Sequence, residues 1–518
     1  MEKFIEKYGE KIIGTQHGFD RIIIKGYIRD FYIDRRFHYF LNHEGCLLKD
    51  YNKYVISNSQ EIKKRVDSIE QETKCYREFL SSPSIDKEKI AKEILSKDPE
   101  KEGLLCILSV TETSQAITVR GNKQTKLKER RCELRRCTHY YFYYNDREFG
   151  LMHVRLQSWL PYTIQIYING KEYLKKQLDK KGIKYQSYNN SITYLKELEE
   201  AQKISNRLIE KKWYEVFDSF VQKINPIARR IENILGRVAY SWCIDECEYA
   251  TDILFKDRET LARLFPRFVE YASLCQVGEN IFTFFGRKLN NHYMGEVVSR
   301  KKNYQQGFCV KFMMDKNWLK MYDKYSVLRI EITINNSRAF KVRKQGKWLP
   351  MGKSISNMYR IAEVAQKCNE RYLDSLAILD CKNDLEKEIE SLCNSKITKL
   401  SGNNANARPY GAFNLLKDFT CKLFNTLMNG AYNIKGFTRK GITEALIKLK
   451  AFSPSEMSDM KKLLGKVTRL LSKLRAHGLI TRYPKTFKYR VTQKGQEIIS
   501  RILLFKKMDL WVGLPVMS

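Results

Sequence analysis

Between residues 104 and 175 the sequence alternates short strand-like runs with turn-forming segments. The runs are rich in Tyr, Val and Ile and alternate polar with apolar residues, as strands with one buried face do. Asn, Asp and Gly interrupt them in GNKQ, NDREFG and ING, which predicts tight turns. Similar runs recur between residues 307 and 351. Closely spaced strands joined by short turns predict a mainly antiparallel central sheet.

Helical patterns lie before, between and after the two strand-rich regions, so we expect the α+β class. The chain of 518 residues is longer than one hydrophobic core usually organises. The second region has too few strands to be stable alone, which favours one sheet interrupted by a helical insertion. The expected segments are 1–103 (a strand and helices, with residues 60–80 helical), 104–200 (strand-rich core), 201–303 (helical insertion), 304–395 (second part of the core and helices), 396–429 (linker and helix) and 430–518 (C-terminal module).

The formal charge of +35 predicts a polyanionic partner, because a folded chain with this much self-repulsion needs counter-charge. Nucleic acid is the expected partner, with solubility alone as the alternative. No apolar run approaches twenty residues, so no membrane partner is expected. The N-terminus has no signal-peptide core, which predicts a cytoplasmic protein with reduced thiols. Glycine-rich phosphate loops and serine-elbow motifs are absent, which argues against ATPase, dehydrogenase and serine-hydrolase chemistry.

The C-terminal module contains an amphipathic helix that ends at AHGLI, where Gly478 suits a left-handed cap. Its apolar stripe consists of Leu463, Leu464, Val467, Leu470, Leu471 and Leu474, and its basic residues are Lys466, Arg469, Lys473 and Arg475. The following ITRYPKTFKYRVT predicts a hairpin. This order resembles the winged helix-turn-helix of bacterial regulators of the MarR type.

The winged-helix resemblance implies that Arg469 and Lys473 face a DNA major groove. It also implies that Arg482, Lys485 and Lys488 contact phosphates from the wing. A winged helix that binds protein or RNA is the alternative.

The run VLRIEITI, which starts at Val327, predicts a strand with one apolar face. Arg329 and Glu331 would then be displayed on the opposite face, where a solvated ion pair is the simple interpretation. The surroundings are basic, so a carboxylate here could instead hold a divalent ion beside phosphate. The cations expected to bind nucleic acid in the core are Arg155, Lys311, Lys320, Lys324, Arg329, Lys341 and Arg343.

The YDK segment followed by LRIE resembles part of rolling-circle replication initiators, which are DNA-nicking enzymes of small plasmids and filamentous phages. The resemblance covers residues 317 to 345 and implies a divalent metal, Mg or Mn, and a tyrosine nucleophile. It implies that Glu331 and Asp323 bind the metal, and it leaves Tyr322 and Tyr325 as alternative nucleophiles. The paired histidines common in such enzymes are missing, so His153 is the single histidine candidate. A structural role for His153 is the alternative.

Other acids could compete as metal ligands. In CIDECEYATDILFKD, helical spacing would place Asp245, Glu248 and Asp252 on one side, although an acidic surface face is the simpler interpretation. Asp20 and Glu296 are isolated acids beside basic groups. The cysteine pairs Cys132/Cys137 and Cys243/Cys247 lack the paired spacing of zinc sites.

The chain as a whole resembles a bacterial family that shares its GFDR start, HVRLQSW strand, LRIEITIN core and winged C-terminus. That resemblance implies a bacterial or mobile-element setting and no mechanism. The leading hypothesis is a DNA-nicking or strand-transfer enzyme of a plasmid, phage or transposable element. The alternative is a nucleic-acid-binding protein without catalysis or cofactor. DNA is favoured over RNA, and the oligomeric state is left open.

Overall fold

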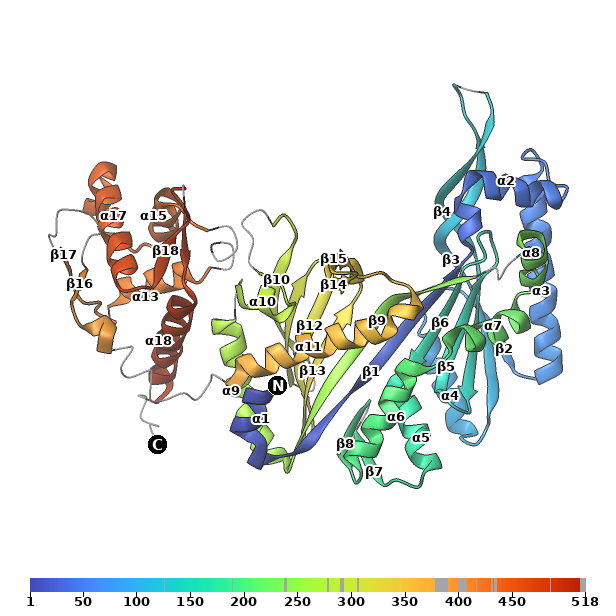
Figure 1. Cartoon of the computed structure of the whole chain (residues 1–518), viewed down its shortest axis with the longest axis horizontal. Helices are drawn as coiled ribbons and strands as arrows, with labels where there is room; N and C mark the ends of the chain where they lie inside the picture. The colour runs from blue at the N-terminus through green and yellow to red at the C-terminus, as the bar shows by residue number, and fades with distance from the viewer. Residues whose placement is uncertain are drawn as a thin grey trace. The chain divides into compact units, whose positions relative to one another are not determined.

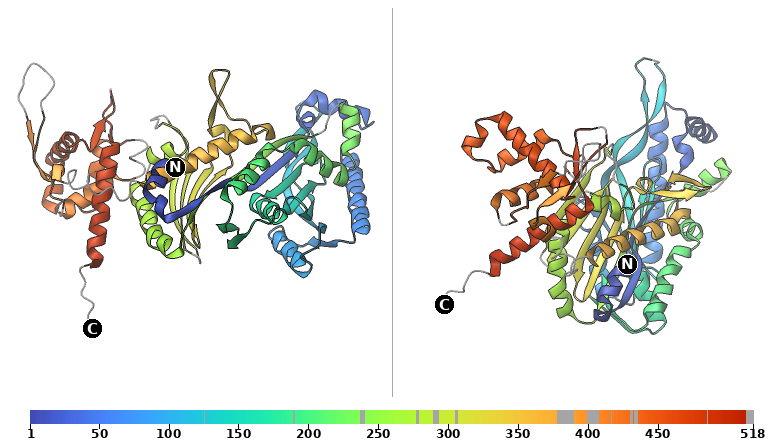
Figure 2. Two further views of the ribbon diagram at one scale, coloured as in Figure 1. Left: turned by 60° about the horizontal axis from the view of Figure 1, so that its bottom comes forward. Right: turned by 60° about the vertical axis from the view of Figure 1, so that its left-hand side comes forward.

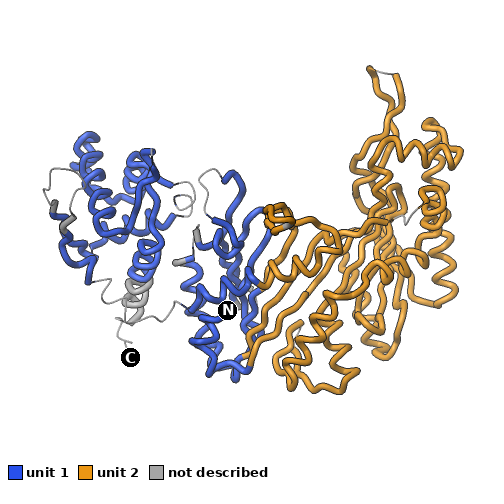
Figure 3. The backbone as a smooth tube through the Cα atoms, viewed as in Figure 1, with its two compact units in different colours: residues 1–13, 255–330, 367–518 blue, residues 14–254, 331–366 orange. Residues whose placement is uncertain are grey.

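The computed structural model describes residues 1–124, 126–188, 190–236, 240–276, 279–288, 293–304, 307–377, 390–398, 408–415, 417–429, 432, 436–484 and 486–512. The chain forms two compact units, shown in different colours in Figure 3. Unit 1 comprises residues 1–13, 255–330 and 367–518, and unit 2 comprises residues 14–254 and 331–366. Each unit is therefore assembled from separate stretches of sequence.

The described residues form one 11-stranded sheet to which both strand-rich regions contribute (Figure 1). This confirms the prediction of a single interrupted sheet. In sheet order the strands are β10 (Val297–Tyr304), β11 (Gly307–Met314), β12 (Asn317–Lys324), β13 (Val327–Ile334), β9 (Ser241–Phe255), β1 (Ile12–Tyr27), β6 (Ile164–Asn169), β5 (Gly150–Gln157), β4 (Lys128–Asp146), β3 (Gly103–Gly121) and β2 (Tyr76–Leu80).

The sheet is mixed, which corrects the prediction of a mainly antiparallel one. Strands β3 to β6 pair antiparallel in sequence order, and β6 pairs antiparallel with β1. Strand β2, however, pairs with β3 in parallel. Helix α4 (Lys87–Lys97) connects these two strands, and a crossover helix is what a parallel connection requires. The sequence YREFL in β2 was predicted to be helical, because it continues a charged helical stretch.

Helices cover the sheet of unit 2 on both faces. Helix α4 packs with Ile90 and Ala91 on Cys106 and Leu108 of β3, and α3 also packs against β3. The helices that lie wholly in this unit, besides α4, are α2 (Asp34–His43), α3 (Tyr51–Thr73), α5 (Gly170–Lys180), α6 (Leu198–Glu210), α7 (Trp213–Ile224) and α8 (Ala228–Leu235). Two small hairpins of this unit are β7 (Tyr185–Tyr188) with β8 (Ser191–Leu195) and β14 (Lys341–Lys344) with β15 (Lys347–Pro350).

Strand β9 corrects the prediction that residues 201–303 form a helical insertion. Helices α6, α7, α8, α9 (Arg258–Cys275) and α10 (Glu279–Phe284) do lie in that range, but β9 joins the sheet between β13 and β1. Its residues from Tyr249 to Phe255 are all buried, so no alternation marks this half as a strand. The acids at 245, 248 and 252 suggested a helix because their spacing also fits a helical turn.

Unit 1 contains α1 (Glu2–Tyr8), α9, α10 and β10 to β12, and it shares α11 (Met358–Leu376) with unit 2. Phe284, Phe312 and Tyr372 pack together in its core, with ring centroids 5.0 to 5.6 Å apart.

The C-terminal part of unit 1 has a hydrophobic core of its own. Its elements are β16 (Lys396–Thr398), β17 (Arg408–Tyr410), α13 (Asp418–Leu427), α15 (Arg439–Lys448), α16 (Pro454–Met457), α17 (Met460–Ala476), β18 (Ile480–Arg482), β19 (Tyr489–Val491) and α18 (Gln493–Val512). The predicted stripe of α17 is buried at Leu463, Val467, Leu471 and Leu474, and Gly478 has the expected positive φ of 72°. Residues 399–407 of the predicted linker lie outside the described residues. Among the helices that the structure describes, none is long and apolar enough to cross a membrane.

Candidate metal centre

Three adjacent strands bring three carboxylates together in unit 2. Glu331 lies on β13, Glu248 on β9 and Asp20 on β1, and these strands are neighbours in the sheet. One carboxylate oxygen of each lies within 4.8 Å of the others. Asp20 is 6% and Glu331 2% exposed, while Glu248 is half-buried. In the described part of the chain, no other group of three or more His, Cys, Asp or Glu residues is placed in this way. We call these three residues the acidic cluster.

The junction of β6 and α5 positions Asp20. The Asn169 side chain caps α5 and donates a hydrogen bond of 3.3 Å to Asn190 Oδ1, and Asn190 Nδ2 donates one of 3.0 Å to Asp20 Oδ1. Gly170 lies so close to β1 that a Cβ would be 1.9 Å from the Phe19 carbonyl oxygen. Only glycine allows this approach, so the residue before Asp20 is held directly against the first turn of α5.

Arg21, which follows Asp20 on β1, is a cation in contact with the acidic cluster. It forms ion pairs with Glu246 and with Glu248, the latter at 3.1 Å. Thr333 of β13 donates a 3.4 Å hydrogen bond to the same Glu248 oxygen. Burial lowers the pKa of Arg21, but Glu248 and Glu246 outweigh it and the net pKa is raised. Arg21 therefore stays charged and fixes the orientation of Glu248.

The donor atoms of the acidic cluster suit a hard divalent cation. Carboxylates this close repel one another unless a proton or a cation lies between them. An all-oxygen carboxylate set matches Mg²⁺, Mn²⁺ or Ca²⁺ rather than zinc or copper. Oxygens around one octahedral Mg²⁺ lie roughly 3 to 4 Å apart. The carboxylate oxygens of the cluster lie within 4.8 Å of one another, so small movements of the three side chains would bring them to these distances. The residues therefore fit the kind of ion implied by the nicking-enzyme resemblance.

His153 belongs to a row of aromatic side chains on β4, β5 and β6 and is not part of the acidic cluster. Its ring stacks on Tyr167 at 5.0 Å and contacts Tyr143 at 4.9 Å. Burial, followed by the charges of Arg155 and Lys87, lowers the pKa of His153 to about 3. The ring is therefore neutral at pH 7. Its packing agrees with the structural interpretation considered for this residue.

The strand of Glu331 is more buried than the sequence suggested. All eight residues of β13 are buried, so the prediction that Arg329 and Glu331 are displayed on a solvent face is wrong. Arg329 is 1% exposed. A strand that is covered on both faces of the sheet has no solvated polar face, so its residues no longer alternate between buried and exposed.

The tyrosines of the YDK segment lie in unit 1, whereas the acidic cluster lies in unit 2. Tyr322 and Asp323 lie in the last three residues of β12 and are half-buried, and burial raises the pKa of Asp323. Tyr325 is 50% exposed in the turn before β13, with a positive φ of 59°. The guanidinium of Arg258 lies 5.2 Å from its ring centroid. Asp323 is not a member of the acidic cluster.

The core cations that were predicted to bind nucleic acid differ in their exposure and in their contacts within the protein. Arg155 pairs with Glu112 at 3.5 Å, and Lys324 lies 5.7 Å from the Tyr322 ring. Lys311 and Lys320 are opposite each other on β11 and β12 and are half-buried. Lys341 and Arg343 on β14 are exposed.

The predicted C-terminal cations also divide into two groups. Arg469, Arg475, Arg482 and Lys488 are exposed. Lys466 forms an ion pair with Glu456, and Lys473 donates a 2.7 Å hydrogen bond to the Ala412 carbonyl. Lys485 lies outside the described residues.

Sequence reasoning missed Arg21 and Asn190, and it considered Asp20 and Glu248 without joining them. The interpretation of Asp245, Glu248 and Asp252 as one helix face is wrong, because β9 is a strand. Asp245 is exposed, and Glu296 is exposed too. The signal that could have found the cluster is polar residues inside three otherwise buried strands, GFDR, DECEY and LRIEIT.

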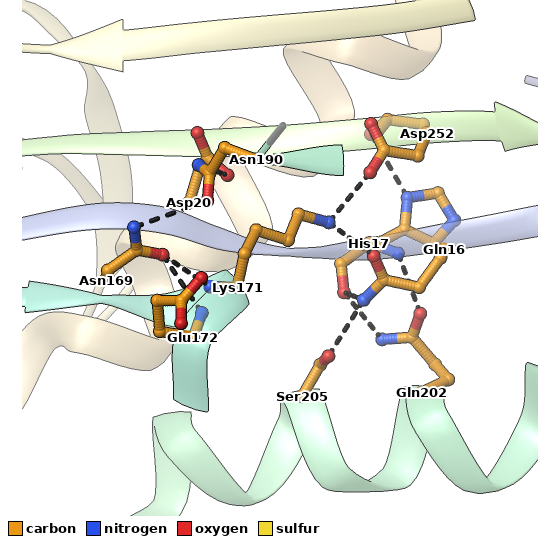
Figure 4. Close-up of polar contacts among 11 residues, drawn as sticks. Gln16, His17, Asp20, Asn169, Lys171, Glu172, Asn190, Gln202, Ser205 and Asp252 are labelled. Carbon is orange, nitrogen blue, oxygen red and sulfur yellow. Dashed lines mark hydrogen bonds and ion pairs between the residues drawn. The ribbon is translucent and has the colours of Figure 1, made fainter. Parts of the chain in front are cut away.

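Asp252 belongs to a separate buried network, which Figure 4 shows beside Asp20. Lys171 Nζ donates hydrogen bonds of 2.6 Å to Gln16 Oε1 and 2.7 Å to Asp252 Oδ2. Gln16 Nε2 donates to Ser205 at 2.8 Å. Lys171 and Asp252 are each 1% exposed, so this ion pair is almost completely removed from water.

No model of a known protein family, no curated protein and no solved structure matches the chain.

Proposed function

We propose that the protein binds nucleic acid and cuts or transfers one strand at a site built on Asp20, Glu248 and Glu331. The observation that carries this proposal is the convergence of three carboxylates from three adjacent strands in a chain with a net charge of +35. Positive charge over the chain attracts a phosphate backbone. A group of three neighbouring carboxylates is unexpected in such a basic protein, and binding of a divalent cation would explain it.

The chemistry that suits such a site is phosphodiester cleavage. A divalent cation held by the three carboxylates would neutralise charge on the phosphate and stabilise the charge that develops during transfer. Arg21 would hold Glu248 in position through their 3.1 Å ion pair, and Asn190 would do the same for Asp20. The attacking group is either a tyrosine, Tyr322 or Tyr325, or a water molecule. A tyrosine would leave a phosphotyrosyl bond that conserves the energy for rejoining.

We also propose that the C-terminal part forms a winged helix-turn-helix that binds duplex DNA. The order α13, α15, α17, β18 and β19 supports this, as does the antiparallel bridge between Phe437 and Tyr489 just before α15. Arg469 and Arg475 on α17 and Lys488 after the turn of the hairpin are exposed and would contact the duplex. A bacterial mobile-element setting, a cytoplasmic location and DNA rather than RNA remain part of the proposal.

A second candidate is a nucleic-acid-binding protein without catalysis. One observation favours it: Glu248 is already paired with Arg21, and Asp20 already accepts a hydrogen bond from Asn190. These contacts offset part of the repulsion within the acidic cluster without a metal ion. Under this alternative the cluster is a buried polar element of the sheet.

The test is strand cleavage of single-stranded and duplex DNA in the presence of Mn²⁺ or Mg²⁺, with recovery of denaturant-resistant protein–DNA adducts. The proposal expects cleavage in the wild type and its loss in Glu331→Gln and Asp20→Asn. Asp245→Asn is the matched control, since Asp245 is an exposed carboxylate outside the cluster. A covalent adduct that Tyr322→Phe or Tyr325→Phe removes would identify the nucleophile. Cleavage that survives in Glu331→Gln, or no cleavage with either cation, would favour the second candidate.

A further inference from the structure

The hairpin formed by β3 and β4 ends in a strongly basic tip. Residues 120–124 and 126–131, here called the basic hairpin tip, contain six basic residues and one acidic residue. Each of the two strands is 19 residues long. In Figure 1 and in the right view of Figure 2 the tip projects beyond α2 and away from the sheet of its unit. The sequence predictions of nucleic-acid contacts did not include any of these residues.

The base of this hairpin is firmly packed. The Ile117 carbonyl accepts hydrogen bonds of 2.8 Å from the Tyr51 hydroxyl and 3.1 Å from Trp159 Nε1. The Arg135 guanidinium lies 3.8 Å from the Trp159 ring centroid. Within the tip itself, Arg130 pairs with Asp34 of α2 at 2.6 Å. The tip therefore extends from a fixed base, so that binding through it orders few additional residues.

Three lysines of the tip have charges that no described neighbour neutralises. Lys123, Lys126 and Lys128 are exposed, and none of them forms a side-chain hydrogen bond or ion pair with the residues that the structure describes. Arg120, by contrast, is paired with Glu133 at 2.9 Å. Leu127 between the lysines is 66% exposed. A surface that keeps three such cations together is suited to a polyanion.

The shape of the tip selects among polyanions. Gly121 pairs with Lys128 and Arg120 with Glu129, and Asn122 N donates a 2.8 Å hydrogen bond to the Leu127 carbonyl, so the tip is a narrow two-stranded ribbon. The major groove of B-DNA, about 12 Å wide and 8.5 Å deep, admits a two-stranded ribbon. The deep, narrow major groove of A-form RNA does not.

We propose that the basic hairpin tip enters a groove of duplex DNA, with Lys123, Lys126 and Lys128 on backbone phosphates. The inference rests on the proposed function for the choice of nucleic acid as the polyanion. It adds a duplex-binding element in unit 2 that is independent of the C-terminal winged helix and of the acidic cluster.

The test compares two triple variants of the full chain with equal loss of charge. Lys123→Gln/Lys126→Gln/Lys128→Gln changes the tip. Lys53→Gln/Lys63→Gln/Lys64→Gln changes three exposed lysines of α3 and is the matched control. Affinity for a duplex DNA of about 30 base pairs, long enough to cover several phosphate contacts, is measured by fluorescence anisotropy over a range of salt concentrations. Unfolding temperatures verify that both variants fold.

The tip variant is expected to bind duplex DNA roughly 10-fold or more weakly. Its plot of log K against log salt should be shallower by about 0.9 for each phosphate that the tip no longer neutralises. The α3 variant should match the wild type. Lys123→Arg/Lys126→Arg/Lys128→Arg should retain binding, because it keeps the charges.

Equal losses of affinity in the two glutamine variants would overturn the inference, because charge alone would then explain binding. An equal loss of affinity for an RNA duplex of the same length would overturn the assignment to a DNA groove. The Glu331→Gln variant separates this inference from the proposed function. One outcome is that neither the wild type nor any variant cuts DNA, while the glutamine variant of the tip still binds duplex DNA more weakly than the wild type. In that case the proposed chemistry is wrong and the inference about the tip stands.

Discussion

Two groups of charged residues in unit 2 each include side chains from β1 and β9, and their electrostatics are opposite. Around Lys171, a cation meets an anion and an amide oxygen: its Nζ contacts Asp252 at 2.7 Å and Gln16 at 2.6 Å. In the acidic cluster, like charges meet: oxygens of Asp20, Glu248 and Glu331 lie within 4.8 Å of one another. The two groups share strands but not their electrostatics.

The difference separates a stabilising arrangement from one suited to a ligand. A buried ion pair with its hydrogen bonds satisfied is self-contained, and removing one partner is strongly destabilising. Carboxylates that face one another repel, and the contacts of Arg21 with Glu248 and of Asn190 with Asp20 offset part of that repulsion. The Lys171 network is therefore an arrangement that supports the strands, whereas the acidic cluster is one that could hold a metal ion.

The largest expected effect is that of Lys171→Met. It leaves the buried Asp252 carboxylate without its cation and should lower the free energy of unfolding by about 3–5 kcal/mol, as measured by urea denaturation. Lys181→Met is the control, because Lys181 pairs with Glu200 at the surface and such pairs contribute about 1 kcal/mol or less. Equal effects of the two substitutions would contradict a stabilising role for the Lys171 pair.

A smaller loss is expected for Gly170→Ala. The new Cβ would lie 1.9 Å from the Phe19 carbonyl oxygen, so β1 and α5 must separate, and the free energy of unfolding should fall by about 1–3 kcal/mol. Because Phe19 precedes Asp20, the same change should also weaken cation binding by the cluster. Gly121→Ala, where a Cβ meets nothing within 4 Å, should have little effect on either quantity. An unaltered stability in Gly170→Ala would show that the strand and helix are not in this close contact.

Two histidines with lowered pKa values make stability depend on pH. Burial lowers the pKa of His153 to about 3 and that of His139 to about 4, below the usual value near 6.5. The unfolded chain therefore binds more protons below pH 6.5, and stability is lost as the pH falls towards the folded pKa values, by at most about 1.4 kcal/mol per pH unit for each histidine. Urea midpoints at pH 7 and pH 5 should differ less in His153→Phe than in the wild type. The exposed His43 provides the control, and His43→Phe should leave the difference unchanged.

The smallest expected effect on stability is that of Glu331→Gln without metal. Removing one of three mutually repelling charges should change the free energy of unfolding by less than about 1 kcal/mol, or raise it, since relieved repulsion offsets the lost hydrogen bonds. Asp252→Asn should destabilise considerably more, because it leaves the Lys171 ammonium buried without a counter-charge. If Glu331→Gln proved as harmful as Asp252→Asn in chelator-treated protein, the cluster would be a structural element like its neighbour.

Local pattern predicted much of the fold but not the cluster. The stripe of Leu463, Val467, Leu471 and Leu474 and the left-handed Gly478 follow from periodicity and backbone sterics, and the structure confirms both. Strand β9 was not predicted, because its acidic residues also fit helical spacing. In a sheet that is covered on both faces, polar and apolar residues no longer alternate along a strand, so the pattern does not identify it.

Glu331 was identified as a candidate metal ligand from its strand, but its proximity to Asp20 and Glu248 was not predicted. Asp20 and Glu248 precede it by hundreds and by tens of residues in the sequence, respectively, and they join Glu331 only because β1, β9 and β13 are neighbours in the sheet. Strand order depends on long-range packing that one sequence does not reveal. The mixed character of the sheet was missed for a related reason, since the parallel pairing of β2 depends on where α4 crosses.

The most direct test of the metal centre is a titration of chelator-treated protein with Mn²⁺. Electron paramagnetic resonance measures the concentration of free ion at each step of the titration. The account predicts a binding site in the wild type that is lost in Asp20→Asn, Glu248→Gln and Glu331→Gln and retained in Asp245→Asn, whose carboxylate is exposed and outside the cluster. A wild type without such a site, or binding that persists in all three cluster variants, would contradict the claim that these carboxylates form a metal centre.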